Sequence, residues 1–146
     1  MTNNRQLIIL TYLILIAVIY YFSRPIDIYE VTAYCNCKIC INKLGFRDKR
    51  FASMEETYFG GIAAPRRIPF GTKIRLIPLK ERDQEAVNEL LEGRLDYIVE
   101  DRGFLIRERR LDIFIPKRMG GHKTAQKWGT RQMRIAIESS PFKESK

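Results

Sequence analysis

The first apolar segment of the chain has no polar face. Between Arg5 and Arg24 lie 18 residues without a charge, and residues 7–22 are apolar apart from one threonine and the tyrosine hydroxyls. As a helix, 18 residues would extend roughly 27 Å, close to the thickness of the hydrocarbon core of a bilayer. The pattern therefore predicts one N-terminal transmembrane helix, and we expect residues 1–24 to be a membrane anchor.

Two other interpretations of this segment stay open. A buried core helix fits less well, because the segment is apolar all round and lies at the end of the chain. A cleaved signal peptide would need a cleavage site of small residues, whereas the segment ends in Tyr-Tyr-Phe-Ser-Arg-Pro. The orientation is also open, because Arg5 and Arg24 flank the two ends with similar charge.

After Pro25 the pattern changes to that of a small domain, which we place at residues 25–140. Alternation of apolar and polar residues, with many β-branched and aromatic side chains, predicts five strands, at residues 28–34, 72–77, 96–100, 111–115 and 131–138. Short strands joined by long connections favour a small β-barrel. The last residues, 141–146, are expected to be a polar tail.

Helical patterns occupy two of the connections. Residues 80–92 place Val87, Leu90 and Leu91 on one stripe, and Gly93 follows as a stop signal. A second, shorter helix is predicted at residues 123–127. The remaining long stretches, residues 36–60 and 62–71, show no clear period and are predicted to be loop and irregular connection, with Gly60-Gly61 as a turn between them.

Composition and net charge limit the classes of possible binding partner but do not identify one. The 146 residues are 45% hydrophobic and 29% charged, which excludes collagen-like and wholly disordered chains. Lysine and arginine number 26 against 17 acidic residues, so the net charge is +9. A basic surface favours an anionic partner, such as a nucleic acid, an anionic membrane or the bacterial cell wall. Because no nucleic-acid-binding motif is present, we expect no nucleic acid among the partners.

A pair of aspartates is the clearest candidate for chemistry, since no phosphate-binding glycine loop, HExxH or GxSxG motif occurs. Asp101 ends one predicted strand and Asp112 opens the next. If the two strands are neighbours, both carboxyl groups reach the same rim of the barrel. Burial between Leu111 and Ile113 and a nearby carboxylate would both raise the pKa of Asp112, which is how a carboxylic acid stays protonated to act as a general acid.

Four segments, in order, resemble the three-aspartate (3D) domain of bacterial cell-wall enzymes. They are Val31-Thr-Ala-Tyr-Cys35, Ala63-Ala-Pro-Arg-Arg-Ile-Pro-Phe-Gly-Thr72, Val99-Glu-Asp-Arg-Gly103 and Leu111-Asp-Ile-Phe114. The resemblance covers roughly residues 28–138. It implies a mainly β fold, a six-stranded double-psi β-barrel with short helical insertions, similar to the catalytic domain of membrane-bound lytic transglycosylase A.

The activity that this resemblance implies is cleavage of peptidoglycan glycan strands between N-acetylmuramic acid and N-acetylglucosamine, with a 1,6-anhydro product. Asp112 would be the general acid/base, and Asp101 would hold or tune it. Thr32, Tyr34 and Lys73 are the implied substrate contacts. The expected location is the cell envelope, with the domain outside the cytoplasm, and no cofactor is expected.

Two departures from the 3D pattern keep a second function open. Ala64 stands where the family's first aspartate would precede Pro65, and the loop after Asp101 reads Gly-Phe-Leu-Ile-Arg-Glu over residues 103–108. The alternative is a barrel without catalysis that binds glycan or a partner protein at the envelope.

The cysteines form a compact group, Cys35-x-Cys37-x-x-Cys40. The CxxC pair could be a disulfide, a redox pair or half of a metal site. Three thiolates with His122, the one histidine of the sequence, would complete a Cys₃His zinc set. Because nothing in the sequence brings His122 near the cysteines, a structural role for them is favoured and no metal is expected.

Overall fold

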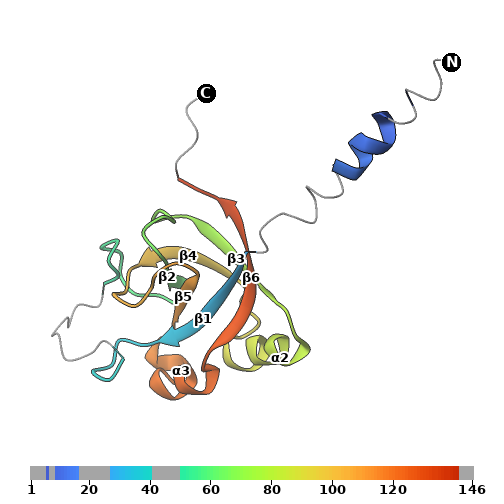
Figure 1. Ribbon diagram of the computed structural model, residues 1–146. Coiled ribbons are helices and arrows are strands. Elements are labelled where there is room, and N and C mark those ends of the chain that lie inside the picture. The colour runs from blue at the N-terminus through green and yellow to red at the C-terminus, as the bar shows by residue number, and fades with distance from the viewer. Residues whose placement is uncertain (1–5, 7–8, 17–26, 41–49, 142–146) are drawn as a thin grey trace.

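The computed structural model describes residues 6, 9–16, 27–40 and 50–141. Six strands close a barrel in the order β1-β5-β2-β4-β3-β6 (Figure 1). The strands are β1 (Ile28–Tyr34), β2 (Gly61–Ala63), β3 (Lys73–Pro78), β4 (Asp96–Asp101), β5 (Arg110–Phe114) and β6 (Arg131–Ser139). The helices between them are α2 (Glu81–Leu90), the 3₁₀ helix η1 (Lys117–Met119) and α3 (His122–Trp128).

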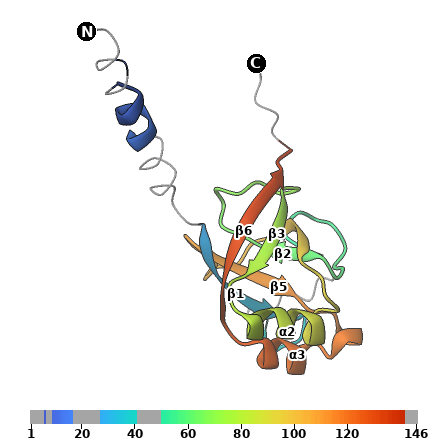
Figure 2. The ribbon, with the colours of Figure 1, turned by 90° about the vertical axis from the view of Figure 1, so that its right-hand side faces the viewer.

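The sheet is mixed. β1 pairs with β5 and β2 with β4 in parallel, while β1–β6, β2–β5, β3–β4 and β3–β6 are antiparallel. Parallel neighbours need long crossover connections, which here contain the helices and the loops. Helices α2 and α3 lie side by side at one end of the barrel (Figure 2), where an ion pair between Lys127 and Glu89 joins them.

The fold class expected from the sequence is wrong. The expectation was a mainly β double-psi barrel preceded by a transmembrane helix, whereas the structure has a mixed six-stranded sheet accompanied by α2, η1 and α3. Among the described residues no helix is both long enough and apolar enough to cross a bilayer. The helical residues 9–16 would extend only about 12 Å, and most of the remaining segment 1–24 lies outside the described residues.

One strand was missed. Gly61–Ala63 was predicted as part of a turn and an irregular connection, but it forms β2 between β4 and β5. All three residues are buried, so the strand shows no alternation that a sequence pattern could detect. Only glycine fits at position 61, because a Cβ there would lie 2.3 Å from the Phe51 ring.

The core fills the inside of the barrel and the space beneath α2 and α3. Trp128 is 1% exposed, and its indole N–H donates to the Val31 carbonyl at 3.1 Å. This hydrogen bond fixes α3 against β1. Other fully buried side chains are Tyr97, Phe114, Ile62, Ile74, Leu76, Leu91, Leu111, Ile113, Ile115 and Met133.

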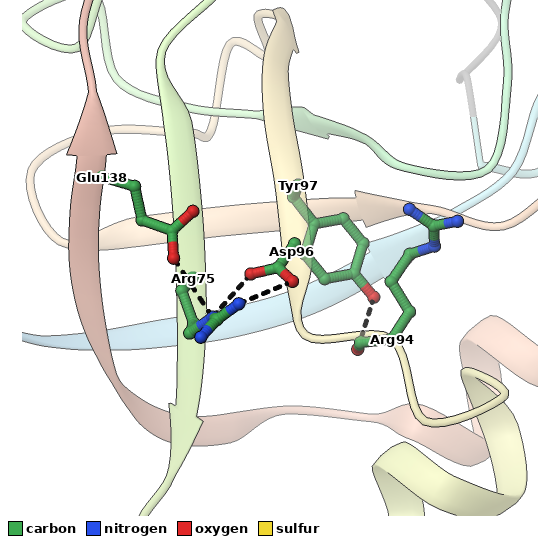
Figure 3. Close-up of polar contacts among 5 residues, drawn as sticks. All are labelled: Arg75, Arg94, Asp96, Tyr97 and Glu138. Atoms are coloured by element: carbon green, nitrogen blue, oxygen red, sulfur yellow. Dashed lines mark hydrogen bonds and ion pairs between the residues drawn. The ribbon is translucent and has the colours of Figure 1, made fainter.

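An exposed ion-pair network crosses the outside of the strands (Figure 3). Arg75 on β3 donates to both Asp96 oxygens, at 2.6 and 2.9 Å, and lies 3.2 Å from Glu138 on β6. The hydrogen bond from Arg75 holds the pKa of Asp96 below its ordinary value. Ion pairs this exposed contribute little to stability, so this network is a surface feature. Asp96 is more exposed to solvent than Asp101 and Asp112.

Candidate functional site

Strand register places Asp101 and Asp112 on either side of one small residue. Ala63 on β2 pairs with Asp112 on β5 and with Asp101 on β4, and Asp112 in turn pairs with Thr32 on β1. Registered residues on neighbouring strands direct their side chains to the same face. A row of four strands therefore carries a hydroxyl, a carboxyl, a methyl and a second carboxyl, in the order Thr32, Asp112, Ala63 and Asp101.

Asp112 sits half-buried between the fully buried Leu111 and Ile113. The Thr32 hydroxyl lies 2.8 Å from Asp112 Oδ1. Burial raises the pKa of Asp112 to about 7, the Thr32 hydrogen bond lowers it, and the charge of Asp101 raises it further. The side chain can therefore be protonated at neutral pH, and it can give up that proton without a large cost.

Asp101 has a different environment. Its Oδ1 accepts hydrogen bonds from the backbone N–H groups of Ala52, at 3.0 Å, and Arg102, at 2.8 Å. Its Oδ2 accepts from the Tyr34 hydroxyl. Burial and the charge of Asp101 raise the pKa of Tyr34 well above its ordinary value, so this hydroxyl stays a donor. Three donors aimed at two oxygens suit an ionised carboxylate, which is an acceptor only.

The two acids thus differ in the way that acid/base sites require. One carboxyl is desolvated and meets a single hydroxyl, while the other is surrounded by donors. The carboxyl group whose pKa is raised by burial, Asp112, is the candidate proton donor of the pair. The arrangement can protonate a leaving oxygen from Asp112 and stabilise positive charge with Asp101.

The other predicted site residues divide into two groups. Thr32 and Tyr34, both on β1, each hydrogen bond to one of the two carboxyl groups. Lys73 does not: it is exposed at the start of β3, paired with Ile98, and within the described part of the chain it contacts neither Asp101 nor Asp112. Substrate contact by these three residues stays a prediction.

Sequence reasoning missed the residue that ties the loop 64–68 to the site. Arg102, next to Asp101, donates to the carbonyls of Ala64 at 2.9 Å and Ile68 at 2.7 Å, and its guanidinium lies 4.1 Å from the centre of the Phe70 ring. Ala64, which precedes Pro65 in this loop, is completely buried. No sequence signal pointed to this role, because an arginine beside a strand end is ordinarily a solvated charge.

The loop that departs from the 3D pattern has an apolar tip. Phe104 is 83% exposed and Leu105 is 68% exposed, and the Arg107 guanidinium lies 4.8 Å from the centre of the Phe104 ring. Ile106, in contrast, turns inward and packs on Gly103. The loop therefore presents an aromatic ring to solvent directly after Asp101.

Two further features lie away from the carboxyl pair. The structure brings His122 next to the cysteines, with Nδ1 3.2 Å from Cys40 Sγ, although the sequence gave no reason to expect it. An open depression is lined by residues of α2 and of the turn after α3, among them Lys80, Asp83 and Trp128. Neither feature includes Asp101 or Asp112.

No protein-family model matches the chain, and a search of curated proteins found no match. Among solved structures, the chain is similar to the lytic transglycosylase MltA from Escherichia coli, at 21% identity and a TM-score of 0.43 over 67% of this chain and 29% of that chain. A structure of E. coli MltA with bound chitohexaose gives 20% identity and a TM-score of 0.43, over 67% of this chain and 30% of the other. The chain spans less than a third of the length of these structures, so its function has to be derived from its own carboxyl groups.

Proposed function

We propose that this chain is a lytic transglycosylase-like enzyme that cleaves the glycan strands of peptidoglycan in the cell envelope. The observation that carries the proposal is the position of Asp112, a half-buried carboxyl group with a pKa of about 7 that shares Ala63 as a strand partner with Asp101. The resemblance of the sequence to the 3D domain supports the choice of substrate class.

The reaction needs one group that gives and takes a proton. Protonated Asp112 donates its proton to the glycosidic oxygen of the leaving N-acetylglucosamine as the bond from that oxygen to C1 of the muramyl sugar breaks. The muramyl C6 hydroxyl attacks the same C1, and the Asp112 carboxylate accepts the hydroxyl proton. One bond forms, one breaks and the acid is restored, so no water is consumed.

Asp101 has a second task in this scheme. Glycosidic cleavage passes through a transition state with positive charge on the sugar ring. A carboxylate held by Tyr34 and two backbone N–H groups keeps its position while that charge develops. Thr32 orients the Asp112 carboxyl group, since its hydroxyl hydrogen bonds to Oδ1 and leaves Oδ2 for the substrate.

Digestion of purified sacculi in H₂¹⁸O tests the proposal. The wild-type chain is expected to release 1,6-anhydromuropeptides without ¹⁸O, because the nucleophile is the sugar's own hydroxyl. Asp112→Asn is expected to fold and to release at least 100-fold less product, as for loss of a general acid/base. Asp96→Asn, the same change at an exposed strand aspartate, is the control and should retain activity. Product from folded Asp112→Asn at the wild-type rate would remove Asp112 from the mechanism.

A barrel that binds glycan without cleaving it is the second candidate. The exposed Phe104 ring favours it, because aromatic faces stack on sugar rings and Phe104 follows Asp101 by three residues in the chain. In that case the wild-type chain would bind sacculi and release no soluble product, and Phe104→Ala would reduce the bound fraction. Release of anhydro product by the wild-type chain would exclude this candidate.

A further inference from the structure

Three thiols from one short segment of the chain meet an imidazole that is distant from them in the sequence. Cys35 follows the last residue of β1, Cys37 and Cys40 lie in the turn that comes next, and His122 is the first residue of α3. Their ligand atoms all lie within 4.8 Å of one another. Cys35 Sγ is 3.6 Å from Cys40 Sγ, and Cys40 Sγ is 3.2 Å from His122 Nδ1.

These separations are close to the edges of a zinc tetrahedron. Zn–S bonds of about 2.3 Å and Zn–N bonds of about 2.0 Å at tetrahedral angles put neighbouring donor atoms about 3.5–3.8 Å apart. Only small shifts are therefore needed for the four donors to share one ion. Thiolates and imidazole are also the donors that zinc favours over the hard oxygen ligands of Mg²⁺ and Ca²⁺.

We propose that Cys35, Cys37, Cys40 and His122 bind one Zn²⁺ ion as a closed structural site. Four protein donors fill the tetrahedron and leave no position for substrate or water, which is the pattern of structural rather than catalytic zinc. The site is independent of the proposed glycan cleavage, because it contains neither Asp101 nor Asp112.

The surrounding backbone is arranged for this convergence. The backbone N–H of Cys40 points to Cys37 Sγ at 3.5 Å, the kind of donor that orients and stabilises a metal-bound thiolate. Gly121, just before His122, has φ of +51° and ψ of −116°, a conformation that side chains disfavour. A Cβ on Gly121 would lie 3.8 Å from Cys35 Cβ, an ordinary van der Waals distance, so it is the backbone conformation that favours glycine where α3 meets Cys35.

The ion would hold the end of β1 in place. The Ile115 N–H donates to the Tyr34 carbonyl at 2.7 Å, and Cys35 comes directly after Tyr34. Zinc would add a second tie at this point by joining β1 to α3. The predicted result is a more rigid anchor for Tyr34, the residue that donates to Asp101.

Metal analysis of the full chain tests the site. The chain is refolded in reductant with Zn²⁺, dialysed and measured by inductively coupled plasma mass spectrometry, and we expect about one zinc per chain. His122→Ala should weaken zinc binding at least tenfold, whereas Lys123→Ala, on the next residue of the same helix, should leave it unchanged. Removal of zinc by a chelator should lower the melting temperature of the wild-type chain.

A Co²⁺ titration keeps the proposal testable if a variant fails to fold. Tetrahedral Co²⁺ with three thiolates gives d–d bands near the red end of the visible spectrum and strong thiolate charge-transfer absorption in the near ultraviolet, and the wild-type chain should show both. Failure to bind Zn²⁺ or Co²⁺ in the reduced chain, or zinc binding unaffected by His122→Ala, would overturn the site. A mass 2 Da below that of the reduced chain after purification without reductant, with no metal bound, would assign the cysteines to a disulfide instead.

Discussion

The Thr32 hydroxyl lies 2.8 Å from Asp112 Oδ1, across the parallel pair β1–β5. The same hydroxyl is 3.3 Å from the Leu111 carbonyl. It has one proton to donate, and it favours the ionised form of Asp112 when it donates to the carboxylate. Burial of Asp112 acts in the opposite direction and is the larger effect. Thr32 therefore limits how far the pKa of this carboxyl group rises.

Replacing Thr32 by valine should move the alkaline limb of the pH–rate profile. In the wild-type chain the rate of glycan cleavage should fall as pH rises through about 7, because Asp112 loses the proton that it donates. Thr32→Val removes the hydrogen bond that lowers the pKa, so the limb should shift to higher pH. The measurement is the initial rate of muropeptide release between pH 5 and pH 9.

Thr130→Val, at an exposed threonine before β6, is the matched control and should leave the profile unchanged. If the alkaline limb of Thr32→Val stayed at the wild-type pH, the pH dependence of the rate would not arise from the titration of Asp112. A purely structural role for Thr32 would reduce the rate equally at every pH, which the same data distinguish.

Asp112→Asn should make stability less dependent on pH. The folded-state pKa of about 7 lies above the ordinary value of 3.8, so the folded chain holds a proton that the unfolded chain releases. Its contribution to stability is full below pH 3.8 and is lost as pH rises through 7. Asparagine cannot ionise, so the variant should gain stability relative to wild type between pH 4 and pH 8.5, up to about 4 kcal/mol.

Urea denaturation of both chains at several pH values across this range measures the difference. The other titrating groups are common to both chains and cancel in the comparison. Parallel stability curves for the two chains would mean that the pKa of Asp112 is not raised in the folded state.

The strands with clear alternation were predictable, and the strand without it was not. Residues 28–34, predicted from alternation alone, form β1 with those bounds. β2 is buried on both faces, so its three residues carry no periodic signal, and only its pairing with β4 and β5 reveals it. Membrane crossing by the N-terminal segment was predicted from apolar length, and the described residues do not bear it out.

The site shows the same division between local and long-range information. Asp101 and Asp112 were selected because the local pattern placed Asp101 at the end of one strand and Asp112 at the start of the next. Asp101 does end β4, whereas Asp112 lies in the middle of β5. Their common neighbour Ala63 and the approach of His122 to Cys40 depend on strand order and on the packing of α3, which join residues far apart in the chain. Lys73 was selected as a cation that could contact the substrate, and strand order places it on β3, beyond β4.

The buried ion pair between Arg131 and Asp83 should contribute more to stability than an exposed pair. Arg131 Nη1 lies 2.7 Å from Asp83 Oδ1, and the Asp83 side chain is only 5% exposed. Asp83→Asn leaves the guanidinium, which also lies over the Trp128 ring, without its counter-charge. We expect a loss of about 3 kcal/mol in the free energy of unfolding.

Glu89→Gln is the comparison, because the Lys127–Glu89 pair is 62% exposed on both sides. Its loss should cost less than about 1 kcal/mol, and added salt should reduce the effect further. Equal losses in the two variants by urea denaturation would contradict the assignment of Asp83 as the residue that stabilises α2 against the start of β6.

Tyr34→Phe should weaken both the fold and the reaction. The variant removes the hydroxyl that donates to Asp101 Oδ2 but keeps the ring, which packs edge-on against Phe114 with centroids 5.5 Å apart. A half-buried carboxylate that loses one of its three donors should cost about 2 kcal/mol in the free energy of unfolding. Because Asp101 is then less firmly held, the maximal rate of glycan cleavage should fall about tenfold.

Tyr58→Phe is the matched control, because the Tyr58 hydroxyl donates to the residue that precedes Asp101 on β4. This hydroxyl donates to Glu100 Oε1 at 3.2 Å from an exposed position. Its removal should change the free energy of unfolding by less than about 0.5 kcal/mol and leave the rate unchanged. If Tyr34→Phe lost stability and kept its full rate, Asp101 would be a structural residue. Asp112 would then be the single carboxyl group that the reaction requires.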